Sequence, residues 1–183
     1  MTGTNGKKRG RPEGGLIKYF QTAEVDATGK AALEASLAKA SVKLTSLRQE
    51  RCFNVQLATD AEALSDEEAA RLRWLLSETY DPDATATATF LAGGAANSCI
   101  LEVGPRLTFA TAFSSNAVSI CASCGLEKIE RIECSRRYLV ETSPALSLAQ
   151  LAEKHATAVH DQMTECVYLE PLATLASDAS GSR

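Results

Sequence analysis

The spacing of apolar residues in the first half of the chain alternates between the periods of strands and of helices. Phe53, Val55 and Leu57 alternate with polar residues, as in a half-buried strand. Leu33 and Leu37 repeat at the spacing of one helix face. This half therefore predicts a strand at 16–20, a helix at 29–40 and two strands within 42–58. A second helix is expected from Ser65 to the residues before Asp81 and Pro82.

Signals for helix ends occur in both halves. Ser65 and Glu68 have the spacing of a capping box, which predicts that a helix begins after Ser65. Ser114 or Ser115 is expected to cap the next helix, and Gly125 to end it. The second half predicts a strand at 99–103, this helix at 114–124 and one or two strands within 128–140. A long helix at 147–164 and a last strand at 167–169 follow.

The order strand, helix, strand, strand, helix thus occurs twice, although the two halves share no clear sequence repeat. An α+β fold of two halves, each with helices on one face of an antiparallel sheet, is the architecture that this order favours. We expect a first α+β half over 16–80 and a second over 99–170, joined by a linker at 81–98 that is rich in Ala, Thr and Gly. A basic tail at 1–15 and a tail at 171–183 are expected to be disordered.

Composition narrows the class of protein. Of 183 residues, 45% are hydrophobic and 23% charged, as in an ordinary globular domain. The net charge of -4 argues against a general nucleic-acid binder. No apolar run approaches the roughly 18–20 residues that span a bilayer, and the N-terminus has no apolar signal core. We therefore expect a cytoplasmic protein without a membrane partner, whose 6 cysteines are reduced thiols.

The basic tail contains one short motif. Residues 8–12 match the core of an AT-hook, in which an Arg-Gly-Arg-Pro run lies in the minor groove of DNA rich in A and T. A single copy of so short a pattern is more often a solvated basic tail, so nucleic acid is an unlikely partner.

Paired cysteines and histidines raise the question of zinc. Cys121 and Cys124 are followed by His155 and His160, and structural zinc sites use such pairs. The two histidines lie five residues apart on an expected helix, so they diverge by about 140° at roughly 100° per residue. One ion would not reach both, and the two cysteines look like small core residues. We therefore predict no metal site.

The turn after the strand at 99–103 has features of an anion site. Arg106 follows Gly-Pro, and Ser114, Ser115 and Asn116 open the next helix, whose free N–H groups suit a phosphate or carboxylate. Arg106 would add a bidentate contact. The alternative is that a serine only caps the helix and that Arg106 pairs with a nearby carboxylate.

A basic cluster lies on the strands that follow. Arg131, Arg136 and Arg137 are interleaved with Glu130 and Glu133. On strands this pattern indicates either a solvated face with cross-strand ion pairs or a docking surface. The sequence contains no nucleophile elbow, P-loop, dinucleotide fingerprint or HExxH motif. The residues alone thus favour an interaction domain over an enzyme, with no catalytic residue.

Several blocks of the sequence resemble one known family. They are ERCFNVQL, LRWLLSETYDP, LEVGPRLTFATAFSSNAVSICASCGL, RIECSRRY and VHDQMTECVY, and they extend from about Leu16 to about Leu169. Each is similar to the N-terminal domain of phosphoribosylformylglycinamidine (FGAM) synthase in its long, plant-type or other eukaryotic form. Three positions depart from the family pattern: Phe113 replaces the usual Trp, and Ala122 and Cys134 replace the usual Arg.

This resemblance implies a fold and a function. The family domain is similar to a fused pair of the small FGAM synthase subunit, each half ferredoxin-like. The parent enzyme is a glutamine-dependent C–N ligase of purine biosynthesis that converts formylglycinamide ribonucleotide (FGAR) to FGAM with ATP and Mg²⁺. The resemblance implies that this domain docks the synthase and glutaminase parts, its partners, and is associated with ammonia transfer.

The resemblance also implies where the chemistry occurs. The nucleotide site and the glutaminase residues lie in later domains, so we expect no cofactor bound by this chain and no activity from it alone. Arg106, Ser114, Ser115 and Asn116, with Arg131 and Arg136, are expected to face the synthase domain near its substrate cleft. A plant-type protein would lie in a plastid or mitochondrion. The alternative function is a stand-alone, non-catalytic binding protein that retains the fold and contacts nucleic acid through its basic tail.

Overall fold

The computed structural model describes residues 16–77, 81–91, 95 and 97–176. The helices and strands alternate along the chain. They are β1 (Ile17–Ala23), α1 (Ala27–Lys39), β2 (Lys43–Leu57), α2 (Asp66–Leu76), β3 (Thr85–Ala86), β4 (Ser98–Pro105), α3 (Ala112–Ser123), β5 (Ile129–Ser143), α4 (Leu148–Lys154) and β6 (Glu165–Tyr168), with 3₁₀ turns at Pro82–Ala84 and Ala156–Ala158.

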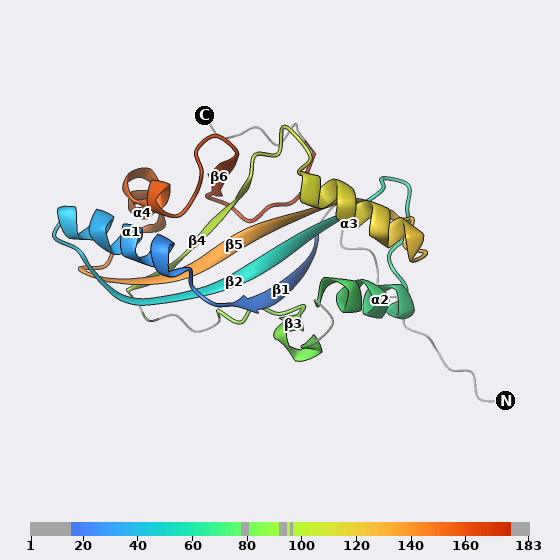
Figure 1. The fold of residues 1–183 in the computed structure, drawn as a ribbon, viewed down its shortest axis with the longest axis horizontal. Coiled ribbons are helices and arrows are strands. Elements are labelled where there is room, and N and C mark those ends of the chain that lie inside the picture. Colours follow the sequence, from blue (N-terminus) through green and yellow to red (C-terminus); the bar gives the residue numbers. More distant parts are fainter. Residues whose placement is uncertain (1–15, 78–80, 92–94, 96, 177–183) are drawn as a thin grey trace.

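All described strands form one antiparallel sheet in the order β3-β1-β2-β5-β4-β6 (Figure 1). The α+β class and the antiparallel pairing are confirmed. A separate sheet in each half is not what the structure shows, because β2 and β5 pair along their length and join the halves. Each of these two strands is one continuous element of 15 residues, where two strands and one or two strands were predicted.

The core lies on one face of this sheet in two apolar clusters. Ile132, Tyr138 and Val140 are separated by even numbers of residues along β5, so they point to the same face although they belong to different clusters. Figure 1 shows α1 and α4 at one end of the strands and α2 and α3 at the other. The buried members are Leu33, Leu37, Val42, Leu101, Val103, Tyr138, Val140, Leu151, Ala156 and Val159 at the first end. At the second end they are Tyr19, Phe53, Val55, Leu72, Leu76, Cys121, Leu126, Ile129 and Ile132.

The helix caps follow the sequence in part. The predicted capping box of Ser65 and Glu68 is present at the start of α2. The predicted cap of α3 by Ser114 or Ser115 is wrong: the cap is Thr111, three residues before Ser114, and its hydroxyl accepts the Ser114 N–H at 3.0 Å. Gly125 follows the helix with a positive φ of 77°, which confirms it as the residue that ends α3.

The predicted long helix over 147–164 is also wrong. The capping box of Ser147 and Gln150 starts α4 as expected, but the helix ends at Lys154. Beyond it the chain forms a 3₁₀ turn that buries Ala156 against α1. The helix therefore does not continue to residue 164, and Met163, within the predicted range, has 85% of its surface exposed.

Two segments expected to be irregular contribute contacts to the fold. Within 81–98, β3 pairs with β1, and Thr89 and Phe90 donate hydrogen bonds to the Glu50 carboxylate. Within 171–176, the Leu175 side chain is fully buried. The AT-hook match at 8–12 lies outside the described residues.

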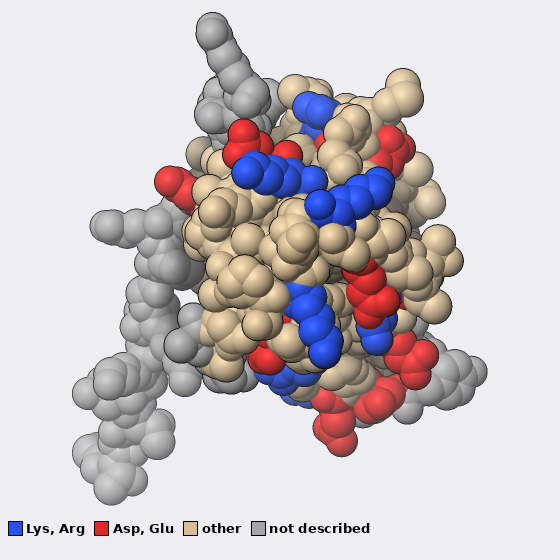
Figure 2. Space-filling model, turned by 90° about the vertical axis from the view of Figure 1, so that its left-hand side faces the viewer, with Lys and Arg blue, Asp and Glu red and all other residues tan. Residues whose placement is uncertain are grey.

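The described surface carries charges of both signs. Figure 2, which looks onto the end of the sheet near α1 and α4, shows Lys and Arg side chains beside Asp and Glu rather than a region of one sign. No helix in the described part of the chain has the length and apolar character needed to cross a membrane.

Candidate functional site

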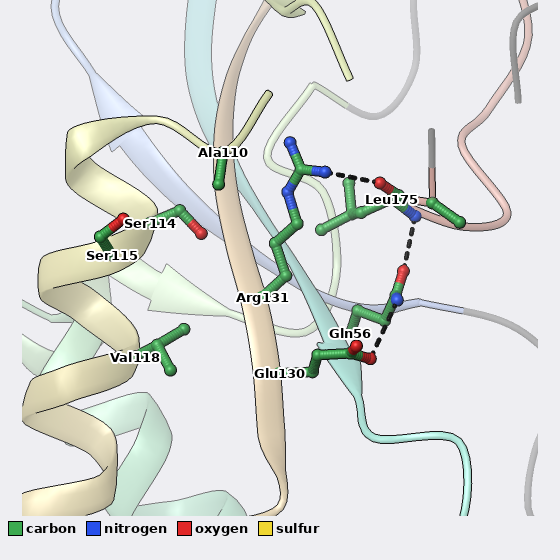
Figure 3. Close-up of a pocket in the computed structure, with 9 residues that line it drawn as sticks. Gln56, Ala110, Ser114, Ser115, Val118, Glu130, Arg131 and Leu175 are labelled. Carbon is green, nitrogen blue, oxygen red and sulfur yellow. Dashed lines mark hydrogen bonds between the residues drawn. The ribbon is translucent and has the colours of Figure 1, made fainter. Parts of the chain in front are cut away.

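A cavity of about 500 Å³ lies beside the start of α3 and brings together three of the predicted site residues (Figure 3). Ser114 and Ser115 come from the helix and Arg131 from β5. The C-terminal segment closes the other side. The lining residues are Gln56, Ala110, Ser114, Ser115, Val118, Glu130, Arg131, Leu175 and Ala176.

Arg131 holds several segments together at this cavity. Its side chain is largely buried, and its Nε donates to the Glu133 carboxylate at 2.9 Å. Its Nη1 donates to the carbonyl oxygens of Leu175 at 2.7 Å and Leu107 at 3.2 Å, and its Nη2 donates to that of Phe109. The guanidinium therefore fastens both the loop before α3 and the C-terminal segment to β5.

Gln56 provides the second attachment of the C-terminal segment. Its amide oxygen accepts the Leu175 N–H at 2.7 Å and the Thr174 hydroxyl at 3.1 Å. Because the Leu175 N–H and C=O are both bound, this residue stays fixed over the sheet (Figure 3).

The anion at the start of α3 comes from the chain itself. Glu133 is 1% exposed and accepts hydrogen bonds from the Thr111 N–H at 3.1 Å and the Thr111 hydroxyl at 2.7 Å. A carboxylate is favourable at a helix N-terminus because the helix dipole is positive there. The carboxylate at the start of α3 is therefore supplied by the neighbouring strand β5, and binding of a further anion there stays a prediction.

The three polar residues at the start of α3 have different surroundings. Ser114 is buried, and its Oγ accepts the Ile132 N–H at 3.2 Å. This hydrogen bond satisfies a backbone N–H of β5 that lies beyond the end of the pairing with β4. Ser115 is exposed and donates to the Thr111 carbonyl at 3.3 Å. Asn116 is exposed and lines a second hollow, between α2 and α3.

Arg106 and Arg136 do not line the cavity. Arg106 is exposed, and its Nη2 donates to the Gln162 carbonyl at 2.9 Å. Arg136 binds the Glu165 carboxylate at 2.7 Å and the Val159 carbonyl at 3.1 Å. Both arginines therefore attach the segment around β6 to the sheet, away from the start of α3.

Gly104, in β4 two residues before Arg106, is required by a close approach. A Cβ atom at this position would lie 2.7 Å from Cε2 and from Oη of Tyr168. The Tyr168 ring crosses β4 there, and its hydroxyl donates to the Pro105 carbonyl at 2.6 Å. Burial, with smaller contributions from nearby charges, raises the pKa of Tyr168 far above its ordinary value, so the hydroxyl keeps its proton.

The face of the sheet opposite the helices carries a buried polar network that the sequence did not indicate. Arg137 forms ion pairs with Glu50, which is fully buried, and with Glu102 at 3.4 Å. The Ser135 hydroxyl donates to Glu102 at 2.6 Å and accepts from the Asn54 amide at 3.2 Å. In the sequence, the interleaving of Arg and Glu predicted cross-strand ion pairs, but it does not say which pairs are buried.

The buried thiols of Cys52 and Cys121 are poorly suited to act as nucleophiles. Burial, and next the charge of Glu102, raises the pKa of the Cys52 thiol to about 12. Burial also raises the pKa of the Cys121 thiol. A thiol with a raised pKa is a weak nucleophile because the thiolate is the reactive form.

The surroundings of the His155 side chain indicate a structural role. Its Nδ1 lies 2.9 Å from the Ser36 hydroxyl of α1. Burial, and then the charge of Lys154, lowers the pKa of His155, which favours the neutral imidazole. Within the described ranges, no three residues among His, Cys, Asp and Glu are placed to hold a metal ion together.

Comparison with known proteins identifies the family. Residues 50–176 match the family described as formylglycinamide ribonucleotide amidotransferase N-terminal. The "Probable phosphoribosylformylglycinamidine synthase, chloroplastic/mitochondrial" of Arabidopsis thaliana is 40% identical over 168 residues, covering 90% of this chain and 12% of that protein.

Two further relatives agree. The phosphoribosylformylglycinamidine synthase of Dictyostelium discoideum is 44% identical over 136 residues, covering 72% of this chain and 10% of that protein. The Homo sapiens protein of the same name is 37% identical over 138 residues, covering 75% of this chain and 10% of that protein. The chain thus spans 10–12% of the length of these curated relatives. Because the family match covers more than half of its residues, the chain belongs to the formylglycinamide ribonucleotide amidotransferase N-terminal family.

Proposed function

We propose that this chain is the N-terminal, non-catalytic domain of a phosphoribosylformylglycinamidine synthase, the glutamine-dependent ligase that converts FGAR to FGAM in purine biosynthesis. The observation that carries the proposal is the match over 72–90% of this chain to three proteins that bear this enzyme's name. Its location follows that of the parent enzyme: the cytoplasm, or a plastid or mitochondrion if the enzyme is of the plant type.

The proposed role of the domain is to dock the synthase and glutaminase parts and to assist ammonia transfer between them. The symmetry of the fold supports an origin from a fused pair of small subunits. Each half contributes the order β-α-β-α-β, and the sheet order β3-β1-β2-β5-β4-β6 reads equivalently from both ends. Two copies of one subunit that meet through β2 and β5 would give this arrangement.

The proposed contact with the synthase domain lies around the start of α3 and the turn after β4. Ser115, Asn116 and Arg106 have the exposure that this role requires. Ser114, Arg131 and Arg136 would support the contact indirectly, because their side chains bind Ile132, Leu175 and Glu165 within the domain. ATP and Mg²⁺ would bind in later domains and not to this chain.

A chimera tests the function. The matching segment of the Dictyostelium discoideum protein is replaced by this chain, and glutamine- and ATP-dependent formation of FGAM is measured. We expect the chimera to be active, a deletion of the segment to be inactive, and the 183-residue chain alone to be inactive. A folded chimera without activity would contradict the proposal, and so would turnover by the isolated chain.

The contact residues are tested in the same chimera. A buried charge-assisted contact costs about 2–5 kcal/mol of binding when one partner is removed, whereas an exposed ion pair costs roughly 0–1 kcal/mol. Arg106→Ala is therefore expected to reduce substrate affinity or turnover at least tenfold, and Lys43→Ala, an exposed cation at the far end of the sheet, is not. Wild-type affinity and turnover in Arg106→Ala would contradict this placement.

A further inference from the structure

Two short segments outside the sheet are fastened to β2 and β5 by the same arrangement of hydrogen bonds. In one of them, the Thr174 hydroxyl and the Leu175 N–H both donate to the side-chain oxygen of Gln56 on β2, at 3.1 and 2.7 Å. The Ala176 N–H donates to the Thr174 hydroxyl at 3.1 Å. Arg131, the cross-strand neighbour of Gln56 on β5, donates to the Leu175 carbonyl at 2.7 Å (Figure 3). We call these five residues the C-terminal clamp.

The second segment has an equivalent arrangement, which we call the internal clamp. The Thr89 hydroxyl and the Phe90 N–H both donate to the carboxylate of Glu50 on β2, at 2.7 and 2.8 Å. The Leu91 N–H donates to the Thr89 hydroxyl at 3.1 Å. Arg137, the cross-strand neighbour of Glu50 on β5, donates to the same hydroxyl at 3.2 Å. The same pattern of a threonine, two following N–H groups, an acceptor on β2 and an arginine on β5 thus occurs twice.

The two clamps differ in the charge of the acceptor. In the internal clamp the acceptor is the fully buried carboxylate of Glu50, whose charge is balanced by Arg137. In the C-terminal clamp the acceptor is the neutral amide of Gln56, and the charge of Arg131 is balanced by Glu133. Hydrogen bonds to a charged group are stronger than those between neutral groups. The contacts of Gln56 are therefore the weaker set, and one substitution there can release the C-terminal clamp without removing a buried charge.

The place of the C-terminal clamp in the chain indicates its role. The internal clamp precedes β4, so it lies on a connection between two strands of the sheet, whereas the C-terminal clamp follows β6, the last described strand. The family match ends at residue 176, which is the last residue of this clamp. The family is described as N-terminal, and the relatives are far longer than this chain. The C-terminal clamp therefore fixes the point at which the polypeptide leaves the family domain.

We infer that the C-terminal clamp positions this domain within the synthase, and that Gln56 is a positioning residue for the glutamine-dependent reaction. This inference rests on the proposed function, in which the domain assists ammonia transfer between the glutaminase and synthase parts. The clamp fixes the start of the connection to those parts. Its release adds residues 174–176 to that connection, which is up to about 10 Å at roughly 3.3–3.6 Å per residue. The domain can then shift, and ammonia from glutamine is transferred less efficiently.

The first test measures whether Gln56 holds the clamp. Gln56→Leu removes the acceptor and keeps a side chain of similar size, in the chimera defined above. Exchange of the amide hydrogens of 174–176 is followed by mass spectrometry. Because the Leu175 N–H loses its acceptor, we expect this exchange to be about tenfold faster than in the unmodified chimera, and exchange of 89–91 to be unchanged. Equal exchange of 174–176 in both proteins would show that Gln56 does not hold the segment, and would overturn the inference.

The second test measures the coupling of the two reactions. Formation of FGAM by the chimera is measured with glutamine and, separately, with ammonium chloride as the nitrogen donor. Ammonia supplied in solution does not depend on transfer between the parts of the enzyme. In Gln56→Leu we therefore expect the rate with glutamine to fall at least about fivefold, the lower end of typical coupling between sites, and the rate with ammonium chloride to stay within about twofold. Thr174→Ala weakens the same clamp and should act in the same direction.

Two control variants separate positioning from stability. Thr89→Ala removes the corresponding hydroxyl from the internal clamp, so it matches Thr174→Ala in chemistry. We expect only Thr174→Ala to lower the ratio of the rate with glutamine to the rate with ammonium chloride. The double variant Gln56→Glu with Glu130→Gln keeps an acceptor for the Leu175 N–H and exchanges the donor and acceptor of the contact between positions 56 and 130. This double variant should retain the unmodified ratio.

Three outcomes of the second test would overturn the inference. An unchanged ratio in Gln56→Leu would mean that the released clamp does not position the domain. An equal fall in both rates would mean that the synthase part itself is impaired. A ratio lowered as much by Thr89→Ala as by Thr174→Ala would mean that the effect is not specific to the C-terminal clamp. Any of these results in an otherwise active chimera would refute this inference alone, whereas an inactive folded chimera without substitutions would refute the proposed function.

Discussion

Gly104→Ala should destabilise the domain because a single methyl group would collide with the Tyr168 ring. The added Cβ would lie 2.7 Å from Cε2 and 2.9 Å from Cζ of this ring. Carbon atoms in contact prefer about 3.5–4.0 Å, so the ring has to move by roughly 1 Å. Tyr168 is 8% exposed and its hydroxyl binds the Pro105 carbonyl, so little room is available for that movement.

Two opposing effects set the size of the change. Overpacking a filled site costs about 1–3 kcal/mol, and loss of the Tyr168 hydrogen bond adds about 1 kcal/mol. Replacing Gly by Ala also restricts the unfolded chain, which stabilises by about 0.4–1 kcal/mol where the backbone is compatible. The clash is larger, so we expect a net loss of about 1–3 kcal/mol in the free energy of unfolding.

A double-mutant cycle isolates the cause. Tyr168→Ala removes the ring, and in that background Gly104→Ala should become neutral or stabilising by up to about 1 kcal/mol. Urea unfolding is followed by far-UV circular dichroism, because the single tryptophan, Trp74, is largely exposed and reports weakly on folding. If Gly104→Ala costs the same with and without the ring, the clash is not the reason for glycine here.

Three other predictions follow from buried groups. Because burial lowers the pKa of His155 from its ordinary 6.5, the unfolded chain binds this proton more readily. Stability should therefore be full above pH 6.5 and decline as the pH falls towards the folded-state pKa, and urea titrations of His155→Gln should show less of this decline. Because its pKa is raised to about 12, the Cys52 thiol should react with a disulfide reagent at pH 8 only after unfolding, and fast reaction of the native protein would contradict this. Glu133→Gln leaves Arg131 without its buried partner and should cost about 3 kcal/mol in urea unfolding, whereas the exposed control Glu130→Gln should stay within about 0.5 kcal/mol; equal effects would contradict the role of Glu133.

Local signals in the sequence predicted most element types, because caps and apolar periods act over a few residues. The capping box at Ser65 and the glycine after α3 are of this kind. The start of α3 was misplaced because Thr111, Ser114 and Ser115 are all competent caps, and the contact of Thr111 with Glu133 favours the first of them. No pattern within α3 contains that contact.

The contacts of the candidate site between residues far apart in the chain could not be predicted from the sequence for the same reason. Pairing of β2 with β5 puts Glu50 opposite Arg137, 87 residues away along the chain. The Leu175 attachment depends on Gln56, 119 residues away. Family resemblance supplied the class of protein, and whether the predicted contacts of Arg106 and Ser115 with a synthase domain occur stays a prediction.

The distribution of the core explains why one sheet forms where two were expected. The cluster near α1 and α4 combines residues of the first half, such as Leu37, with residues of the second, such as Leu101. The cluster near α2 and α3 likewise combines Phe53 with Ile132. Burial of apolar surface is the dominant favourable term in folding, and neither half can complete its own burial without the other. The repeated element order therefore describes a symmetry within one sheet, and the hollow between α2 and α3 takes its lining residues from both halves.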